Sequence, residues 1–170
     1  PMMVLMKALI IGEKQYTRGL IKQALEDFPM VSVEGEAVTL DTGLRLIEQL
    51  KTSIVFLDLG DDMDRYFSFV EKVNELCPNT GVVVTSEKDS REIIIRALRA
   101  GASDYLMFPL RHEEIDRAIA KVGRSLDATS TGHTGLGKVV SIFNSKGGSG
   151  ATTIATNVAA NIMKYSDKNA

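Results

Sequence analysis

The stretch Ser53-Ile54-Val55-Phe56-Leu57-Asp58-Leu59 contains five large apolar residues and a single acidic one, Asp58, close to its end. A continuous apolar run of this length predicts a strand buried on both faces, which is the usual environment in a parallel sheet. Sheets of that kind bind their ligands at the carboxyl ends of the strands. The stretch therefore predicts a central strand and marks Asp58 as a candidate site residue.

Similar apolar runs lie on both sides of this stretch at regular intervals. They predict four further strands, at 7–11, 31–38, 81–86 and 103–108. Apolar residues at helical spacing predict five helices, at 16–28, from Asp41 or Thr42 to 50, at 69–77, from Asp89 or Ser90 to 100, and at 115–126.

Residues that typically end helices support these boundaries. Pro29 and Pro78 are placed to stop two of the helices, and Gly101 stands where a left-handed C-cap is needed. Helices of this length between strands force crossover connections, and right-handed crossovers produce a parallel sheet with helices on both faces. The sequence therefore predicts a doubly wound α/β domain with its site at the carboxyl ends of the strands.

Composition narrows the class of protein. The 170 residues carry 20 Lys+Arg against 22 Asp+Glu, and the net charge of -2 argues against a nucleic-acid partner. The single cysteine, Cys77, excludes an internal disulfide and a CxxC metal site, and it fits a reducing cytoplasm. No apolar run approaches the roughly 20 residues that cross a bilayer. We expect a soluble, cytoplasmic protein without a transmembrane segment.

The composition changes after the last predicted helix. We predict a domain at 1–126, a Gly/Ser/Thr-rich linker at 127–137, and a second unit at 138–170. The second unit reads as one strand at 138–143, a Gly-rich turn and one helix at about 152–165. About thirty residues cannot enclose a core, so we expect this unit either to be the truncated start of a second domain or to dock on another structure.

The first domain resembles the receiver domain of two-component response regulators over roughly residues 5–126. The resemblance rests on Ile54-Val55-Phe56-Leu57-Asp58-Leu59, on Val82-Val83-Val84-Thr85-Ser86, and on Gly101-Ala102-Ser103-Asp104-Tyr105-Leu106 shortly before Pro109. It implies a flavodoxin-like, five-stranded parallel sheet of order 2-1-3-4-5, and a cis peptide bond before Pro109. It also implies that Asp58 stands at the phosphoacceptor position and that Thr85 and Tyr105 stand at the switch positions.

The chain departs from the receiver pattern at two charged positions. The acidic pair that holds Mg²⁺ in the family becomes Gly12 and Glu13, which leaves Glu13 and Asp58 as a weak Mg²⁺ site. The lysine that pairs with the phosphate becomes Phe108, also at a switch position, which either fills the lysine's channel or contributes to a partner contact. Losing a cation at ~4 Å forfeits on the order of 4 kcal/mol at an effective dielectric of ~20. That is roughly a thousandfold in the stability of a phosphorylated state.

The Gly-rich turn forms a second motif. A glycine loop between a strand and a helix cradles phosphate through its backbone N–H groups and the helix N-terminus. The turn resembles the deviant P-loop of the MinD/ParA ATPases, with Ala151 in place of the cradle lysine. The resemblance implies a nucleotide site in the full-length protein, with ATP bound by Lys146, Gly147, Gly148, Gly150, Thr152 and Thr153.

A receiver-like domain followed by such an ATPase resembles the TadZ/CpaE-type pilus assembly proteins. The resemblance implies a role for the cytoplasmic domain in dimerisation, or in localisation to a cell pole, during assembly of Flp (tight-adherence) pili. Partners would then be a second copy and pilus assembly proteins. The family's usual dimer face would place Arg96, Tyr105 and Arg117 near a two-fold axis. The chain alone is not expected to be an enzyme; weak ATP hydrolysis is an expectation for the full-length protein.

Two functions therefore remain open from the sequence. The first is a receiver-fold interaction module without phosphorylation, motivated by the charges missing at Gly12 and Phe108. The second is a phosphorylatable receiver, in which Asp58 accepts a phosphoryl group within a phosphorelay that controls the attached ATPase.

Overall fold

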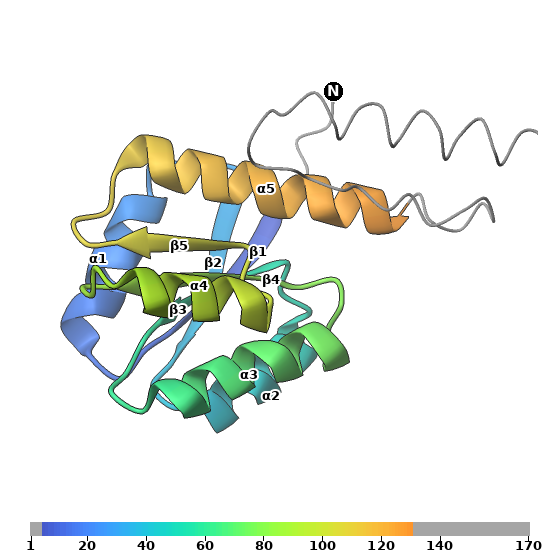
Figure 1. Ribbon diagram of the computed structural model, residues 1–170. Helices are drawn as coiled ribbons and strands as arrows, with labels where there is room; N and C mark the ends of the chain where they lie inside the picture. Colours follow the sequence, from blue (N-terminus) through green and yellow to red (C-terminus); the bar gives the residue numbers. More distant parts are fainter. Residues whose placement is uncertain (1–4, 131–170) are drawn as a thin grey trace, which may run out of the picture. The chain divides into compact units, whose positions relative to one another are not determined.

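The computed structural model describes residues 5–130, which form a five-stranded parallel sheet flanked by five helices (Figure 1). The strand order is β2-β1-β3-β4-β5, so the predicted fold class and sheet order are confirmed. The strands are β1 (Met6–Ile11), β2 (Val31–Ala37), β3 (Ile54–Asp58), β4 (Gly81–Ser86) and β5 (Asp104–Met107). The helices are α1 (Gln15–Leu25), α2 (Leu40–Leu50), α3 (Met63–Leu76), α4 (Arg91–Ala100) and α5 (His112–Ser130).

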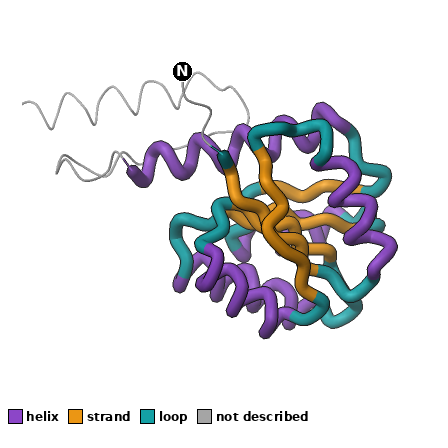
Figure 2. The backbone as a smooth tube through the Cα atoms, turned by 180° about the vertical axis from the view of Figure 1, so that it is seen from behind, coloured by secondary structure: helices purple, strands orange, loops and turns teal. Residues whose placement is uncertain are grey.

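Each face of the sheet has its own core, because successive residues of a strand point to opposite faces. On β1, Leu9 and Ile11 pack with α2, α3 and α4, whereas Ala8 and Ile10 pack with α1 and α5. Every residue of β3 is buried, as its unbroken apolar run predicts. The tube in Figure 2 shows the strands enclosed between these helical layers.

The ends of α4 and α2 show which of the predicted capping residues are used. Ser90 caps α4 by accepting from the Ile93 amide, and Gly101 ends it at φ 111°, as predicted. The prediction for α2 was wrong, because the cap is Thr39, whose hydroxyl accepts from the Thr42 amide.

Three helices differ clearly in length from the prediction. α3 begins at Met63 rather than at residue 69. α1 ends at Leu25 rather than at residue 28, because the Phe28 amide bonds to the Leu25 carbonyl in a tighter turn. α5 continues to Ser130, into the predicted linker, since the sequence contains no glycine or proline between Leu126 and Ser130 to stop it. The rest of the predicted linker and the unit at 138–170 lie outside the described residues.

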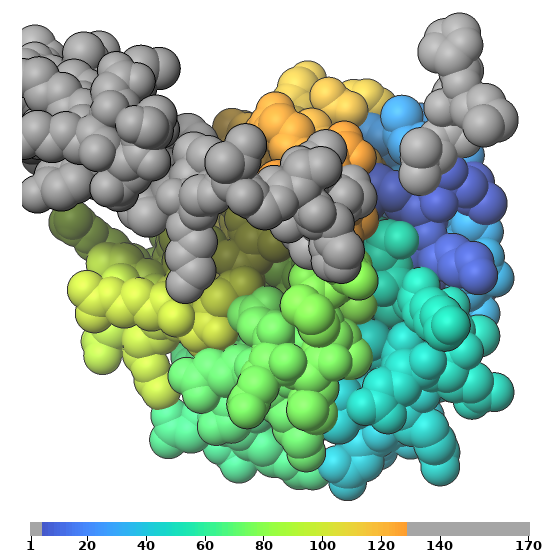
Figure 3. Space-filling model, turned by 90° about the vertical axis from the view of Figure 1, so that its right-hand side faces the viewer, coloured from blue at the N-terminus to red at the C-terminus, as the bar shows by residue number. Residues whose placement is uncertain are grey.

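The carboxyl ends of the strands meet at one edge of the sheet. Asp58 pairs with Thr85 in the register of β3 and β4. The opposite end of the domain, where strands begin, faces the viewer in Figure 3. No helix between residues 5 and 130 has the length and apolar character needed to span a membrane.

Candidate functional site

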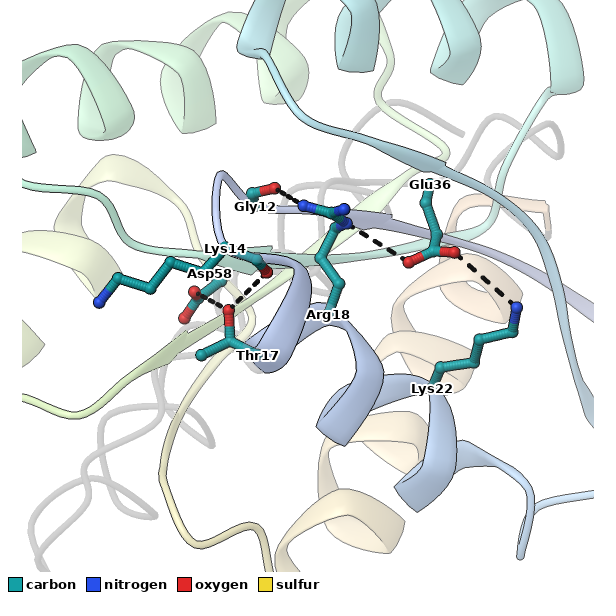
Figure 4. Close-up of polar contacts among 7 residues, drawn as sticks. All are labelled: Gly12, Lys14, Thr17, Arg18, Lys22, Glu36 and Asp58. Carbon is teal, nitrogen blue, oxygen red and sulfur yellow. Dashed lines mark hydrogen bonds and ion pairs between the residues drawn. The ribbon is translucent and has the colours of Figure 1, made fainter.

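The carboxylate of Asp58 lies at the end of β3 with both oxygens hydrogen-bonded. The Thr17 hydroxyl donates to Oδ2 at 2.7 Å, and the Thr85 hydroxyl donates to Oδ1 at 3.2 Å. The Thr17 hydroxyl is also 3.1 Å from the Lys14 carbonyl, but its single proton favours the closer and charged acceptor (Figure 4). Two hydroxyls from two different elements therefore hold Asp58.

Burial dominates the electrostatics of this carboxylate. Asp58 is 7% exposed, and this desolvation raises its pKa above the ordinary value of 3.8. The hydrogen bonds from Thr17 and Thr85, and the charge of Lys14, act in the opposite direction. Figure 4 shows the Lys14 side chain running past Asp58, and the two make no ion pair within 4 Å among the described contacts. Among the described residues, two hydroxyls thus bond directly to the carboxylate, and the Lys14 charge acts on it without an ion pair.

Gly12 occupies a position with very little room. A Cβ added there would lie 3.0 Å from the Asp58 Cβ, closer than most real contacts. The Gly12 carbonyl accepts from Arg18 Nη1 at 2.7 Å, and Arg18 Nε lies 3.4 Å from Glu36 (Figure 4). Lys22 completes this chain with Glu36 at 3.8 Å. These contacts tie the start of α1 to the loop that holds Gly12 beside Asp58.

Glu13 is held by a tyrosine. The Tyr66 hydroxyl, from the buried face of α3, donates to Glu13 Oε1 at 3.0 Å. Burial, and then the Glu13 carboxylate, raise the pKa of Tyr66, so this hydroxyl keeps its proton. Glu13 therefore already has a partner in the structure.

These residues fit Mg²⁺ poorly. Mg²⁺ requires near-octahedral oxygen coordination. Within residues 5–130, no three His, Cys, Asp or Glu side chains come together as a possible metal site. Of the two predicted ligands, Glu13 bonds to Tyr66 and Asp58 bonds to two hydroxyls.

Phe108 lies at the border between the core and a surface groove. Its half-buried ring packs against the core on the α1 and α5 side of the sheet. The same residue lines a groove of about 610 Å³ between α1 and the connection from β5 to α5. The Phe108–Pro109 peptide bond is cis, as the resemblance implies.

The side chains at the two remaining switch positions, Thr85 and Tyr105, form hydrogen bonds within the domain. Thr85 is fully buried and donates to Asp58. Tyr105 is half-buried, and its hydroxyl donates to the Lys88 carbonyl at 2.9 Å. Burial raises the pKa of Tyr105. Both side chains therefore have partners inside the domain without any phosphoryl group.

The structure adds site residues that the sequence analysis missed. Thr17 had a detectable signal, since it lies four residues before Ile21 on the apolar face of the predicted helix. Tyr66 and Arg18 gave no local signal, because their partners lie on other elements. The predicted nucleotide-binding residues Lys146, Gly147, Gly148, Gly150, Thr152 and Thr153 lie outside the described residues.

Comparison with known proteins gives a consistent result. Residues 8–120 match the family described as the response regulator receiver domain. The protein-glutamate methylesterase/protein-glutamine glutaminase 3 of Geobacter sulfurreducens is 34% identical over 105 residues. The match covers 62% of this chain and 28% of that protein. The chain spans about half the length of several other curated relatives that it matches.

Solved structures share the fold. The signal receiver domain of a NarL response regulator from Mycobacterium tuberculosis superimposes with a TM-score of 0.63 at 24% identity, covering 71% of this chain and 97% of that one. A protein from Burkholderia pseudomallei, described as pilus assembly-related, superimposes with a TM-score of 0.62 at 18% identity. That match covers 74% of this chain and 94% of the other.

Proposed function

The chain belongs to the response regulator receiver domain family, and we propose that its receiver domain works without phosphorylation, as a protein-interaction module. The module serves self-association or localisation of a larger protein. The single observation that carries the proposal is the Thr17–Asp58–Thr85 network, in which two hydroxyls bond to the carboxylate and no cation from residues 5–130 forms an ion pair with it.

Charge explains why this arrangement disfavours a phosphoryl group. Such a group on Asp58 carries about -1.5 to -2 charges, which need neutralisation beside the buried strand ends. Phe108 supplies apolar surface at the position where the family has a lysine. Gly12 supplies no carboxylate for Mg²⁺, and Glu13 is bound to Tyr66. The site therefore lacks the positive charge of the lysine and has fewer ligands to hold the positive charge of Mg²⁺.

A phosphodonor assay on the full 170-residue chain tests the proposal. The chain is incubated with radiolabelled acetyl phosphate and Mg²⁺, and acid-stable and hydroxylamine-sensitive labelling is measured, with Asp58→Asn as the blank. We expect no labelling above this blank. Stable labelling that depends on Asp58 would overturn the proposal.

A restored variant provides the matched positive control. Gly12→Asp with Phe108→Lys returns the missing carboxylate and the missing cation to the site. We expect this double variant to bind beryllofluoride, a phosphoryl mimic, in a Mg²⁺-dependent manner, and the wild-type chain to bind none. Binding is read from amide chemical shifts at Thr85.

One observation favours the alternative of a phosphorylatable receiver. The Thr85 hydroxyl already lies 3.2 Å from Asp58, where it would contact a phosphoryl oxygen. In that alternative, Mg²⁺ binds weakly at Glu13 and Asp58 after Glu13 leaves Tyr66. A Mg²⁺ titration that shifts the resonances of both carboxylates, followed by Asp58-dependent labelling, would establish it.

We propose in addition that the complete protein continues as a MinD/ParA-like ATPase of the TadZ/CpaE type. It would act in the cytoplasm in Flp pilus assembly, with pilus assembly proteins as partners and recruitment to a cell pole. The turn at 146–153 supports this proposal, and the Burkholderia pseudomallei neighbour supplies a related description at the level of fold. ATP titration of the full-length protein, with Lys146→Ala as the comparison, tests the nucleotide site. A fluorescent fusion tests polar localisation.

A further inference from the structure

The outer face of α1 is an exposed helix surface without charge. Tyr16, Gly19, Leu20 and Gln23 lie at positions i, i+3, i+4 and i+7, which place them along one side of a helix. With Gln15, they line a shallow hollow of about 550 Å³, and none of the five is Asp, Glu, Lys, Arg or His. A quarter of the whole chain is charged, so an exposed helix face of this length without charge calls for a physical reason.

Tyr16 is prominent on this face. It is 73% exposed, more than the other large hydrophobic residues that lie exposed within the described part of the chain. It borders both the shallow hollow and the neighbouring groove that contains Phe108 and Leu110. An exposed aromatic ring next to an apolar groove is typical of protein interfaces.

Gly19 adds the room for a close approach. A Cβ at Gly19 would meet nothing within 4 Å, so no contact inside the domain requires glycine there. Glycine in a helix interior is less stable than alanine. Gly123 in α5 is equally open, which means that a helical glycine alone marks no interface. The α1 face differs because its glycine adjoins an exposed aromatic ring and an uncharged surface.

We infer that a second copy of the chain docks on this face, with the two α1 helices antiparallel across a two-fold axis. This inference rests on the interaction role proposed above. An axis between residues 19 and 20 places Leu20 of each copy over Gly19 of the other. It also places Tyr16 of each copy against Gln23 of the other. A two-fold interface needs such reciprocal pairs.

The chemistry of the face favours a second copy over a charged partner. A two-fold axis brings like residues together, so a charged face would repel itself. An amide both donates and accepts hydrogen bonds, so Gln23 can bond to the Tyr16 hydroxyl of a second copy. The acidic residues Asp27 and Glu87 are not among the five residues of the shallow hollow, but they border this face, because they line the neighbouring groove together with Tyr16, Leu20 and Gln23.

The face on α4 and β5 is a weaker candidate, because two charged side chains around it, Arg96 and Lys121, form ion pairs within the domain. Arg96 bonds to Asp64 and lies over the Phe67 ring. Lys121 pairs with Asp104 at 3.3 Å. These contacts would have to break before the same side chains could reach a second copy.

Sedimentation velocity on the full 170-residue chain, from micromolar to near-millimolar concentration, tests the inference. We expect a monomer–dimer equilibrium. Tyr16→Lys and Gln23→Glu should each weaken it at least tenfold, and the double variant should recover most of the affinity because the new charges face each other across the axis. The control Leu98→Glu, on exposed α4, should leave the dimer unchanged. A wild-type chain that stays monomeric, a double variant without recovery, or a dimer lost only in Leu98→Glu would each overturn the inference.

A glycine pair separates folding from docking. Gly19→Ala and Gly123→Ala should both raise the melting temperature by a few degrees, because both lie in open positions in helices. Only Gly19→Ala should weaken the dimer, by filling the space that Leu20 of the second copy needs; equal effects on the dimer would contradict the inference. Failure here would leave the phosphodonor result untouched, since labelling of Asp58 does not depend on the oligomeric state.

Discussion

At the level of the residue, the behaviour of this domain depends on how one buried carboxylate is compensated. Asp58 is deeply buried, and desolvation outweighs the two hydroxyls and Lys14 in setting its pKa. In a domain that bound Mg²⁺ and a phosphoryl group, a lysine and a metal would share this task. Here the hydroxyls of Thr17 and Thr85 take it over, and they carry no full charge.

The raised pKa of Asp58 predicts how stability depends on pH. The folded state holds this proton more tightly than the unfolded state, whose pKa is near 3.8. The resulting stabilisation is complete below that pH and is lost as the pH rises through the raised folded-state pKa. We therefore expect Asp58→Asn to melt a few degrees above wild type at pH 7, with the difference vanishing near pH 3.

Thermal unfolding followed by circular dichroism from pH 3 to 7 measures this difference. Asp61→Asn, at an exposed carboxylate in the next loop, should shift the melting temperature by no more than about one degree at pH 7. Equal melting temperatures for wild type and Asp58→Asn at pH 7 would contradict the prediction.

Thr17 predicts a second effect at the same site. Thr17→Val removes a hydroxyl that donates to a buried carboxylate, at a cost of about 1–3 kcal/mol in the free energy of unfolding. It should also raise the pKa of Asp58 further. Thr17→Ser keeps the donor and should cost much less. Urea unfolding at pH 7 measures both variants, and similar losses in the two would show that packing, rather than the hydroxyl, is responsible.

At the level of the element, capping sets where helices begin and end. Thr39 caps α2, whereas the sequence analysis favoured Asp41 or Thr42. At the end of α4, Gly101 has a positive φ, and a Cβ there would overlap the Asn74 side chain, which holds the Ala100 carbonyl. Single side chains thus fix boundaries that apolar periodicity only approximates.

The α2 cap gives a prediction with an internal control. Thr39→Ala should lower the free energy of unfolding by about 1 kcal/mol, because it removes the acceptor for the Thr42 amide. Asp41→Ala leaves that bond in place and loses only a favourable charge in the first turn, about 0.3–1 kcal/mol or less. Guanidinium unfolding of the two variants measures the difference, and a larger loss in Asp41→Ala would reverse the assignment.

Much of the fold follows from periodicity because apolar strands and amphipathic helices are local patterns. The proximity of Asp58 and Thr85 could also be predicted from the sequence, since both lie near the ends of buried strands that parallel pairing brings to one edge. The contacts of Glu13 with Tyr66 and of Thr17 with Asp58 join residues 53 and 41 positions apart. No local pattern encodes such distances, so the sequence left open what compensates the carboxylate.

At the level of the whole molecule, the described residues form two cores, one on each face of the sheet. One lies between the sheet and α2, α3 and α4, and the other between the sheet and α1 and α5. The residues in them run from Met6 to Leu126.

The presence of two cores within residues 5–130 predicts that the domain folds alone. A chain ending at residue 130 should unfold cooperatively, with a melting temperature within about 2 °C of the first transition of the full chain. Differential scanning calorimetry of both chains measures this. A shortened chain that is unfolded or aggregates would place part of the core in the remaining residues and would contradict the predicted domain boundary.

The tight position of Gly12 has a consequence for how this protein can change over generations. An aspartate at residue 12 would press a second carboxylate against the buried Asp58, and a lysine at residue 108 would replace half-buried apolar contacts with a charge. We expect each replacement alone to cost stability, because each places a charge where the structure has close or apolar contacts. A chain that regained phosphorylation by these two substitutions, one after the other, would therefore pass through a less stable single variant. A change on an exposed docking surface carries no such intermediate cost.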